Sequence, residues 1–193
     1  MAIVTIPALA RRITDRAELD AFLAGEGIEH DVWPLEDRVD PAAPPEAILA
    51  AYAPEIEALK QRGGFVTADV IDVRPETPNL EALLAKFSKE HTHTEDEVRF
   101  ILQGSGIFHI NPVARPVYAI EVHAGDLISV PRDTRHWFDL CGDKRIRAIR
   151  LFQDMSGWTP HYAADGVHGG YQPLCMGPAQ LAGQGAGSGG TRL

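Results

Sequence analysis

The sequence lacks any apolar run that approaches the ~20 residues a membrane-spanning helix requires, so we predict no membrane association. The segment Met1–Pro7 lacks a basic region followed by a long apolar one, which argues against a secretion signal. Dense basic clusters are also missing and the net charge is −9, so nucleic acid is not an expected partner. A small molecule remains the expected kind of ligand.

Cysteine is scarce, with Cys141 and Cys175 alone. The two residues form neither a framework of several disulfides nor a C-x-x-C motif, and this favours a reducing compartment. We therefore predict a cytoplasmic protein in which both cysteines are chemically inert.

The composition is that of a soluble globular protein, with 45% apolar and 23% charged residues in a chain of 193. That length suits one domain with an ample core. We predict a single domain over residues 1–176, with helical elements near its N-terminus packed on a barrel. Residues 177–193 are rich in glycine and are predicted to form a flexible tail. We expect the protein to be a monomer.

The first ninety residues mix helical and β patterns, which apolar periodicity, capping residues and proline delimit. The expected elements are an edge strand within 1–10, a helix that begins at Thr14 or Asp15, a short strand at 30–35, a helix at 46–61 that Pro54 bends or splits, a strand at 65–73 and a short helix capped by Asn79.

From residue 91 onward, short β-rich runs follow one another with turn residues between them. The runs are 98–103, 106–111, 117–122, 126–131, 135–140 and 145–152. Many short strands at regular spacing indicate a sandwich or a small barrel.

The pattern His91-x-His93-x-x-x-Glu97 opens this region. His91 and His93 are two residues apart, so on an extended chain their side chains point to the same side. Glu97 returns to that side if the intervening turn keeps register. A second strand would then have to deliver His136 to the same point. The spacing thus predicts a metal ion held inside a β-barrel.

Three neutral imidazoles and one carboxylate make a mixed nitrogen and oxygen site of low ligand charge. Such a site suits Fe(II), Ni(II), Mn(II), Co(II) or Zn(II) better than Ca(II) or a thiolate-preferring metal. Four protein ligands on an octahedral ion leave two neighbouring positions open, where a substrate could bind through two oxygens.

The motif, the following Gly104 and Gly106, and the later run Gly125–Pro131 with His136 resemble the two-part pattern of the cupins. The flanks resemble more specifically the acireductone dioxygenase family of methionine salvage. The segments that carry this resemblance are 97–102, 135–140, 149–152, Trp33, 52–56, Gly64-Phe65 and Trp158. The resemblance spans roughly residues 1–176. It implies a mainly β, cupin-type double-stranded β-helix (jelly-roll barrel) with a few peripheral α-helices.

The same resemblance implies a site and a reaction. It implies one Fe(II) or Ni(II) per chain on His91, His93, Glu97 and His136, with catalytic residues Arg99 and Arg150 and pocket residues Phe87, Phe138 and Trp158. The family's substrate is an enediol-ketone with a methylthio tail that O2 cleaves. Fe(II) directs cleavage to formate and 2-oxo-4-methylthiobutanoate. Ni(II) directs it to formate, carbon monoxide and 3-methylthiopropanoate.

Simpler explanations compete for single residues. Arg99 could pair with a carboxylate on a strand, the aromatics could be core residues, and Asp96 could lie behind the ligands or in a solvated turn. Asp126 is expected to fix a turn, and the other histidines to be core or surface residues. For the whole chain, the alternatives are another cupin isomerase or dioxygenase, or a cupin that binds a small acid without catalysis.

Overall fold

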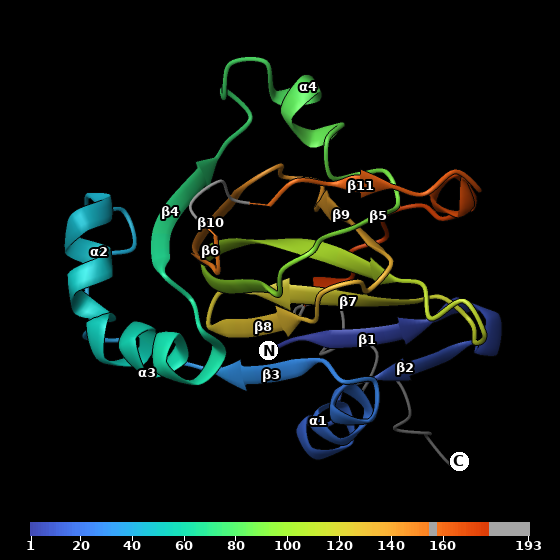
Figure 1. The fold of residues 1–193 in the computed structure, drawn as a ribbon, viewed down its shortest axis with the longest axis horizontal. Helices are drawn as coiled ribbons and strands as arrows, with labels where there is room; N and C mark the ends of the chain where they lie inside the picture. The colour runs from blue at the N-terminus through green and yellow to red at the C-terminus, as the bar shows by residue number, and fades with distance from the viewer. Residues whose placement is uncertain (155–157, 178–193) are drawn as a thin grey trace, which may run out of the picture.

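The computed structural model describes residues 1–154 and 158–177, and its eleven strands form two antiparallel sheets that share the long strand β6 (Figure 1). One sheet has the order β11-β5-β9-β6-β7-β1-β2, and the other runs β4-β10-β6-β8-β3. The strands are β1 (Ile3–Ile6), β2 (Arg11–Ile13), β3 (Glu29–Val32), β4 (Thr67–Val73), β5 (His91–Thr92), β6 (Glu97–Ile110), β7 (Tyr118–His123), β8 (Asp126–Val130), β9 (His136–Leu140), β10 (Ile146–Phe152) and β11 (His161–Tyr162).

The predicted mainly β, cupin-type fold is confirmed, although hydrogen bonds between the described strands do not close them into a continuous barrel. One apolar cluster joins residues from both sheets, such as Val4, Ile120, Ile128 and Ala148, and forms the inner core. A second cluster lies beneath the helices on the outer side of β6, β8 and β10.

Strand β6 spans two strands that the sequence analysis predicted separately. The side chains that point to the inner core switch from odd to even positions along it. Arg147 pairs with Gln103, but the next residue, Ala148, pairs with Ile101, so β6 carries one extra residue at that point. Such a bulge reverses the alternation of side chains. Ile101 therefore belongs to the inner core before the bulge, and Phe108 after it, although their positions differ in parity. Gly104 provides the positive φ of +77° beside the bulge.

The helices cover the outside of the sheets (Figure 1). They are α1 (Arg16–Gly25), α2 (Pro45–Ala51), α3 (Ala53–Gly63) and α4 (Leu80–Leu84), with 3-10 turns at Pro7–Leu9 and Val167–Gly170. Asp15 caps α1 by accepting a hydrogen bond from the Glu18 amide, and Pro54 marks the predicted split between α2 and α3. Asn79 precedes α4, but its side chain makes no capping hydrogen bond. Among the described helices, none is long and apolar enough to cross a membrane.

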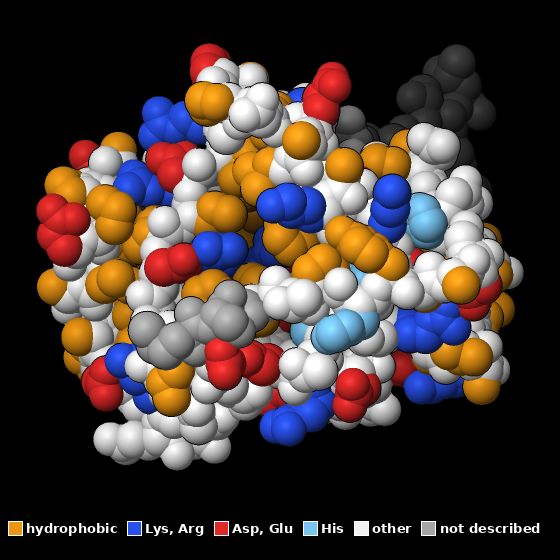
Figure 2. Space-filling view, turned by 45° about the horizontal axis from the view of Figure 1, so that its top comes forward, with side chains coloured by type: hydrophobic (Ala, Val, Ile, Leu, Met, Phe, Trp, Pro, Cys, Tyr) orange, Lys and Arg blue, Asp and Glu red, His pale blue; other side chains and the backbone are white. Residues whose placement is uncertain are grey.

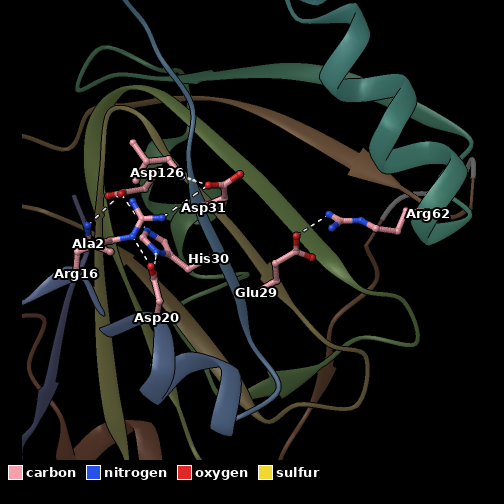
Figure 3. Close-up of polar contacts among 9 residues, drawn as sticks. Ala2, Arg16, Asp20, Glu29, His30, Asp31, Arg62 and Asp126 are labelled. Carbon is pink, nitrogen blue, oxygen red and sulfur yellow. Dashed lines mark hydrogen bonds and ion pairs between the residues drawn. The ribbon is translucent and has the colours of Figure 1, made fainter. Parts of the chain in front are cut away.

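The N-terminal strand is not an edge strand as predicted, since β1 lies between β2 and β7. Its start is anchored by the buried Asp126, which accepts hydrogen bonds from the Ala2 amide at 3.0 Å and the His123 amide at 2.8 Å. His30 links Asp126 to Asp20 of α1 through its two ring nitrogens (Figure 3). Asp126 therefore fixes the predicted turn before β8, and also ties three distant segments together.

The expectation of two inert, separate cysteines is wrong, because Cys141 and Cys175 form a disulfide. Cys141 follows β9, so the bond fastens the C-terminal segment to the sheet. The buried Glu121 supports that junction by accepting hydrogen bonds from the Met176 and Gly177 amides. The pairing requires the fold to bring positions 34 residues apart together. The predicted flexible tail, apart from Gly177, lies outside the described residues.

Candidate metal centre

Four side chains converge between the ends of three strands. His91 lies on β5 and pairs directly with His136, the first residue of β9. Glu97 begins β6, and His93 lies in the loop between β5 and β6. Their ligand atoms all lie within 4.8 Å of one another, and each residue is 1–2% exposed. The strand pairing thus delivers His136 to the His-x-His motif, as the sequence analysis required.

Each of the three imidazoles is oriented by its other nitrogen. The Nδ1 atoms of His91, His93 and His136 lie 2.6, 3.1 and 2.8 Å from the carbonyl oxygens of Lys89, Thr159 and Thr134. A carbonyl only accepts, so each Nδ1 carries a proton, which leaves Nε2 as the atom of each ring that can bind a metal ion. Backbone partners of this kind are typical of metal-binding histidines.

The inward-facing atoms fit a divalent transition metal. The Nε2 atoms of His91 and His93 are buried and have no hydrogen-bond partner in the described part of the chain. Buried polar atoms of this kind normally have a partner, and binding to a metal ion would provide one. Burial, and next the proximity of His136, lower the pKa of His91 to about 4, so its imidazole is neutral at physiological pH. Burial alone would raise the pKa of Glu97, but Arg99 and the two neighbouring histidines hold it well below its usual range. The site therefore offers imidazole nitrogens and one ionised carboxylate, a donor set that suits such an ion.

Arg99 lies against this cluster, on the same side of β6 as Glu97. It is 5% exposed, and its Nε lies 2.8 Å from Glu97 Oε1. Neither of these two atoms has an aligned hydrogen bond in the described residues, so the contact is an ion pair only. The guanidinium carbon lies 4.5 Å from the ring centroid of Phe138 and 5.3 Å from that of Trp158. The arrangement buries a fixed positive charge beside the ligands.

Arg150 is opposite Arg99 in the β6–β10 pairing, so both side chains point to the same face. It donates two hydrogen bonds, at 2.9 and 2.6 Å, to the carboxylate of Asp69, its pairing partner on β4. Its guanidinium also lies 5.5 Å from the Trp158 ring centroid. Sequence analysis did not single out Asp69, whose role depends on the β4–β10 register.

The three predicted aromatics surround the cluster. The Phe87 ring lies 6.2 Å from His91 and that of Trp158 lies 6.1 Å from His93, while Phe138 contacts Arg99. A fourth ring, Phe108, packs 4.7 Å from Phe138 and was missed because the β6 bulge reverses the side-chain alternation. Gly106 makes room for Phe138, since a Cβ at this position would lie 2.2 Å from that ring.

The face of the molecule in Figure 2 has one marked hollow. Hydrophobic side chains form its walls, and Lys or Arg side chains lie within it. This combination suits a small anionic molecule with an apolar part.

Asp96 directly precedes Glu97, and its carboxylate accepts hydrogen bonds from the Arg132 amide and the Gln153 side chain. Asp96 is not among the four clustered residues, and its side chain is 28% exposed. Elsewhere His109 is buried and stacks on Trp137 with ring centroids 4.8 Å apart, in line with a core role.

Comparison with known proteins assigns the chain and its fold to one family. Residues 28–160 match the ARD/ARD′ family. The chain is 41% identical over 175 residues to an acireductone dioxygenase of Exiguobacterium sibiricum, covering 86% of this chain and 98% of that protein. It is 44% identical over 156 residues to one from Granulibacter bethesdensis, covering 81% and 87%.

A solved structure of acireductone dioxygenase from Bacillus anthracis, with a cadmium ion in its active centre, superposes with a TM-score of 0.77 at 38% identity. It covers 84% of this chain and 98% of that one. The chain therefore belongs to the acireductone dioxygenase (ARD/ARD′) family of metal-dependent dioxygenases.

Proposed function

We propose that this protein cleaves acireductone, 1,2-dihydroxy-3-keto-5-methylthiopentene, with O2. The observation that carries the proposal is the buried group of His91, His93, Glu97 and His136 with Arg99 against it. A divalent ion held by these four residues would supply Lewis-acid chemistry and a template for a substrate that binds through two oxygens.

The positive charge of Arg99 is placed to stabilise negative charge on the substrate oxygens. Because its side chain is fixed between aromatic rings and Glu97, little reorganisation is needed when that charge develops. Arg150 adds a second cation near Trp158, with its charge balanced by Asp69.

The aromatic walls provide a site for the methylthio tail of the substrate. The ring centroids of Phe87, Phe108 and Phe138 lie 6.0, 5.4 and 4.5 Å from the guanidinium carbon of Arg99, and these rings present apolar surface beside the charge. The Trp158 Nε1 is buried and has no partner among the described residues, which leaves it free to donate a hydrogen bond to substrate.

The proposal includes the choice of products. With Fe(II) we expect formate and 2-oxo-4-methylthiobutanoate, and with Ni(II) formate, carbon monoxide and 3-methylthiopropanoate. The nitrogen and oxygen donors accept either ion.

The test is to strip the protein of metal, reload it with one equivalent of Fe(II) or Ni(II), and supply synthetic acireductone. Oxygen uptake and identification of the products by chromatography are then measured for each form. O2 uptake with the two expected product sets supports the proposal. Absence of O2 uptake by both loaded forms would refute it and favour an isomerase or a binding protein.

A further inference from the structure

The loop that separates two of the proposed ligands is only three residues long. Thr94, Glu95 and Asp96 connect His93 with Glu97. The backbone of this loop sets how far apart the two ligand side chains lie, since each is attached to one of its ends. Any group that fixes the loop therefore acts on the geometry of the metal centre.

Gln153, which lies far from the loop in sequence, holds the loop through several hydrogen bonds. Its Oε1 accepts a hydrogen bond from the Asp96 amide at 3.2 Å, and its Nε2 donates to Asp96 Oδ2 at 3.3 Å. Its own backbone amide donates to the Glu95 carboxylate at 3.0 Å. Two consecutive loop residues are thus bound by one glutamine, through main chain and side chain.

Gln153 is itself well anchored. It directly follows β10, which pairs along its length with β4 and β6. Its Nε2 also donates to the carbonyl of Gly63, the last residue of α3, at 2.8 Å. The preceding residue, Phe152, packs with its ring centroid 4.6 Å from that of Trp158. The loop is therefore tied to a helix end and to a central strand.

We propose that Gln153 is a positioning residue of the metal centre, which holds the 94–96 loop so that His93 and Glu97 bind the same ion. The inference rests on the metal centre proposed above, not on the identity of the substrate. Without the Gln153 side chain the loop loses two of its hydrogen bonds and keeps those from the Arg132 and Gln153 amides, so the loop is held less firmly and either ligand is released more readily. Loss of a residue that supports metal ligands typically weakens metal binding by about 10–100-fold.

The test compares Gln153→Met with Gln103→Met. Methionine matches glutamine in length and removes the side-chain hydrogen bonds. Gln103, an exposed residue on β6, serves as the matched control. Each protein is loaded with Ni(II) and mixed with excess chelator, and Ni(II) release is followed by absorbance. We expect release about 10–100-fold faster from the Gln153 variant and unchanged from the control.

A purely structural role predicts a different result. It would lower the melting temperature of the metal-free Gln153→Met protein and leave the rate of Ni(II) release at the wild-type value, and that outcome overturns the inference. Gln153→Asn is measured beside it, since it keeps the amide but withdraws it by one methylene. Wild-type release from this variant also counts against the inference.

A double-mutant cycle with Asp96→Ala checks the route of the effect. If Gln153 acts through the loop, the two substitutions together accelerate release by less than the product of their separate effects. Independent, multiplicative effects contradict it. Failure of wild-type protein to bind Ni(II) at all would remove the metal centre as well, which separates that failure from one of Gln153 alone.

Discussion

Replacement of Arg99 by methionine separates a catalytic charge from a structural one. Arg99 is buried, pairs with Glu97 at 2.8 Å and is stacked among aromatic rings, so methionine retains much of the packing and removes the charge. If the guanidinium stabilises charge on substrate oxygens, turnover per bound metal should fall by about two to three orders of magnitude.

The same substitution changes stability in a way that depends on metal. In the metal-free protein it leaves the buried carboxylate of Glu97 without its cation, a situation that typically costs about 3–5 kcal/mol. For a chain of this size, each 1 kcal/mol shifts the melting temperature by about 2–4 °C, so we expect a decrease of about 6–20 °C. A bound divalent ion supplies positive charge to Glu97, so the decrease should be smaller in the loaded protein.

The assay measures turnover per bound metal and the melting temperature on the same samples, with and without metal. Arg62→Met is a matched control, because Arg62 is exposed and pairs with Glu29 at 2.6 Å on the surface (Figure 3). Such a surface pair contributes less than about 1 kcal/mol. Arg99→Lys should restore only part of the rate, because an ammonium lacks the planar guanidinium geometry. Wild-type turnover per metal in Arg99→Met, together with reduced stability, would refute a catalytic role.

Three further predictions concern the ligands, a buried histidine and the disulfide. His93→Ala and His136→Ala should each remove most of the bound metal, and full metal content by elemental analysis would contradict the assignment. Burial opposes protonation of His30, but its hydrogen bonds to Asp126 and Asp20 raise its pKa above the ordinary value. Its charged form therefore stabilises the fold below about pH 6.5, and this contribution disappears as pH rises through the folded-state pKa. His30→Gln should accordingly lower the free energy of unfolding in urea more at pH 5.5 than at pH 9, and an equal loss at both would refute the reasoning. Replacing Cys141 and Cys175 by serine removes a link between positions 34 residues apart and should cost about 3–4 kcal/mol without changing metal content. A reductant should then lower the melting temperature of the wild type but not of this variant.

Local features of the sequence determined much of the site and several elements. The His91-x-His93 spacing places two imidazoles on one side of an extended segment whatever the rest of the chain does, and Asp15 and Pro54 set helix limits by local capping and backbone restriction. The resemblance of the segments around these residues to one family supplied the fold class, and the comparisons confirmed it.

The register of the strands could only be decided by the tertiary structure. His136 reaches the site because β9 pairs with β5, and Phe108 faces it because a bulge in β6 shifts the side-chain alternation. A single inserted residue exchanges the two faces of a strand, and the free energy that selects it comes from packing across both sheets rather than from neighbours in sequence.

Contacts between residues far apart in the chain could not be predicted from the sequence either. Asp69 with Arg150, Gln153 with Asp96, and Cys141 with Cys175 all join segments distant along the chain. Their residue types fit many partners, and no local spacing distinguishes one from another. The sequence by itself determined which residues could hold a metal, whereas the fold decided which residues orient and support them.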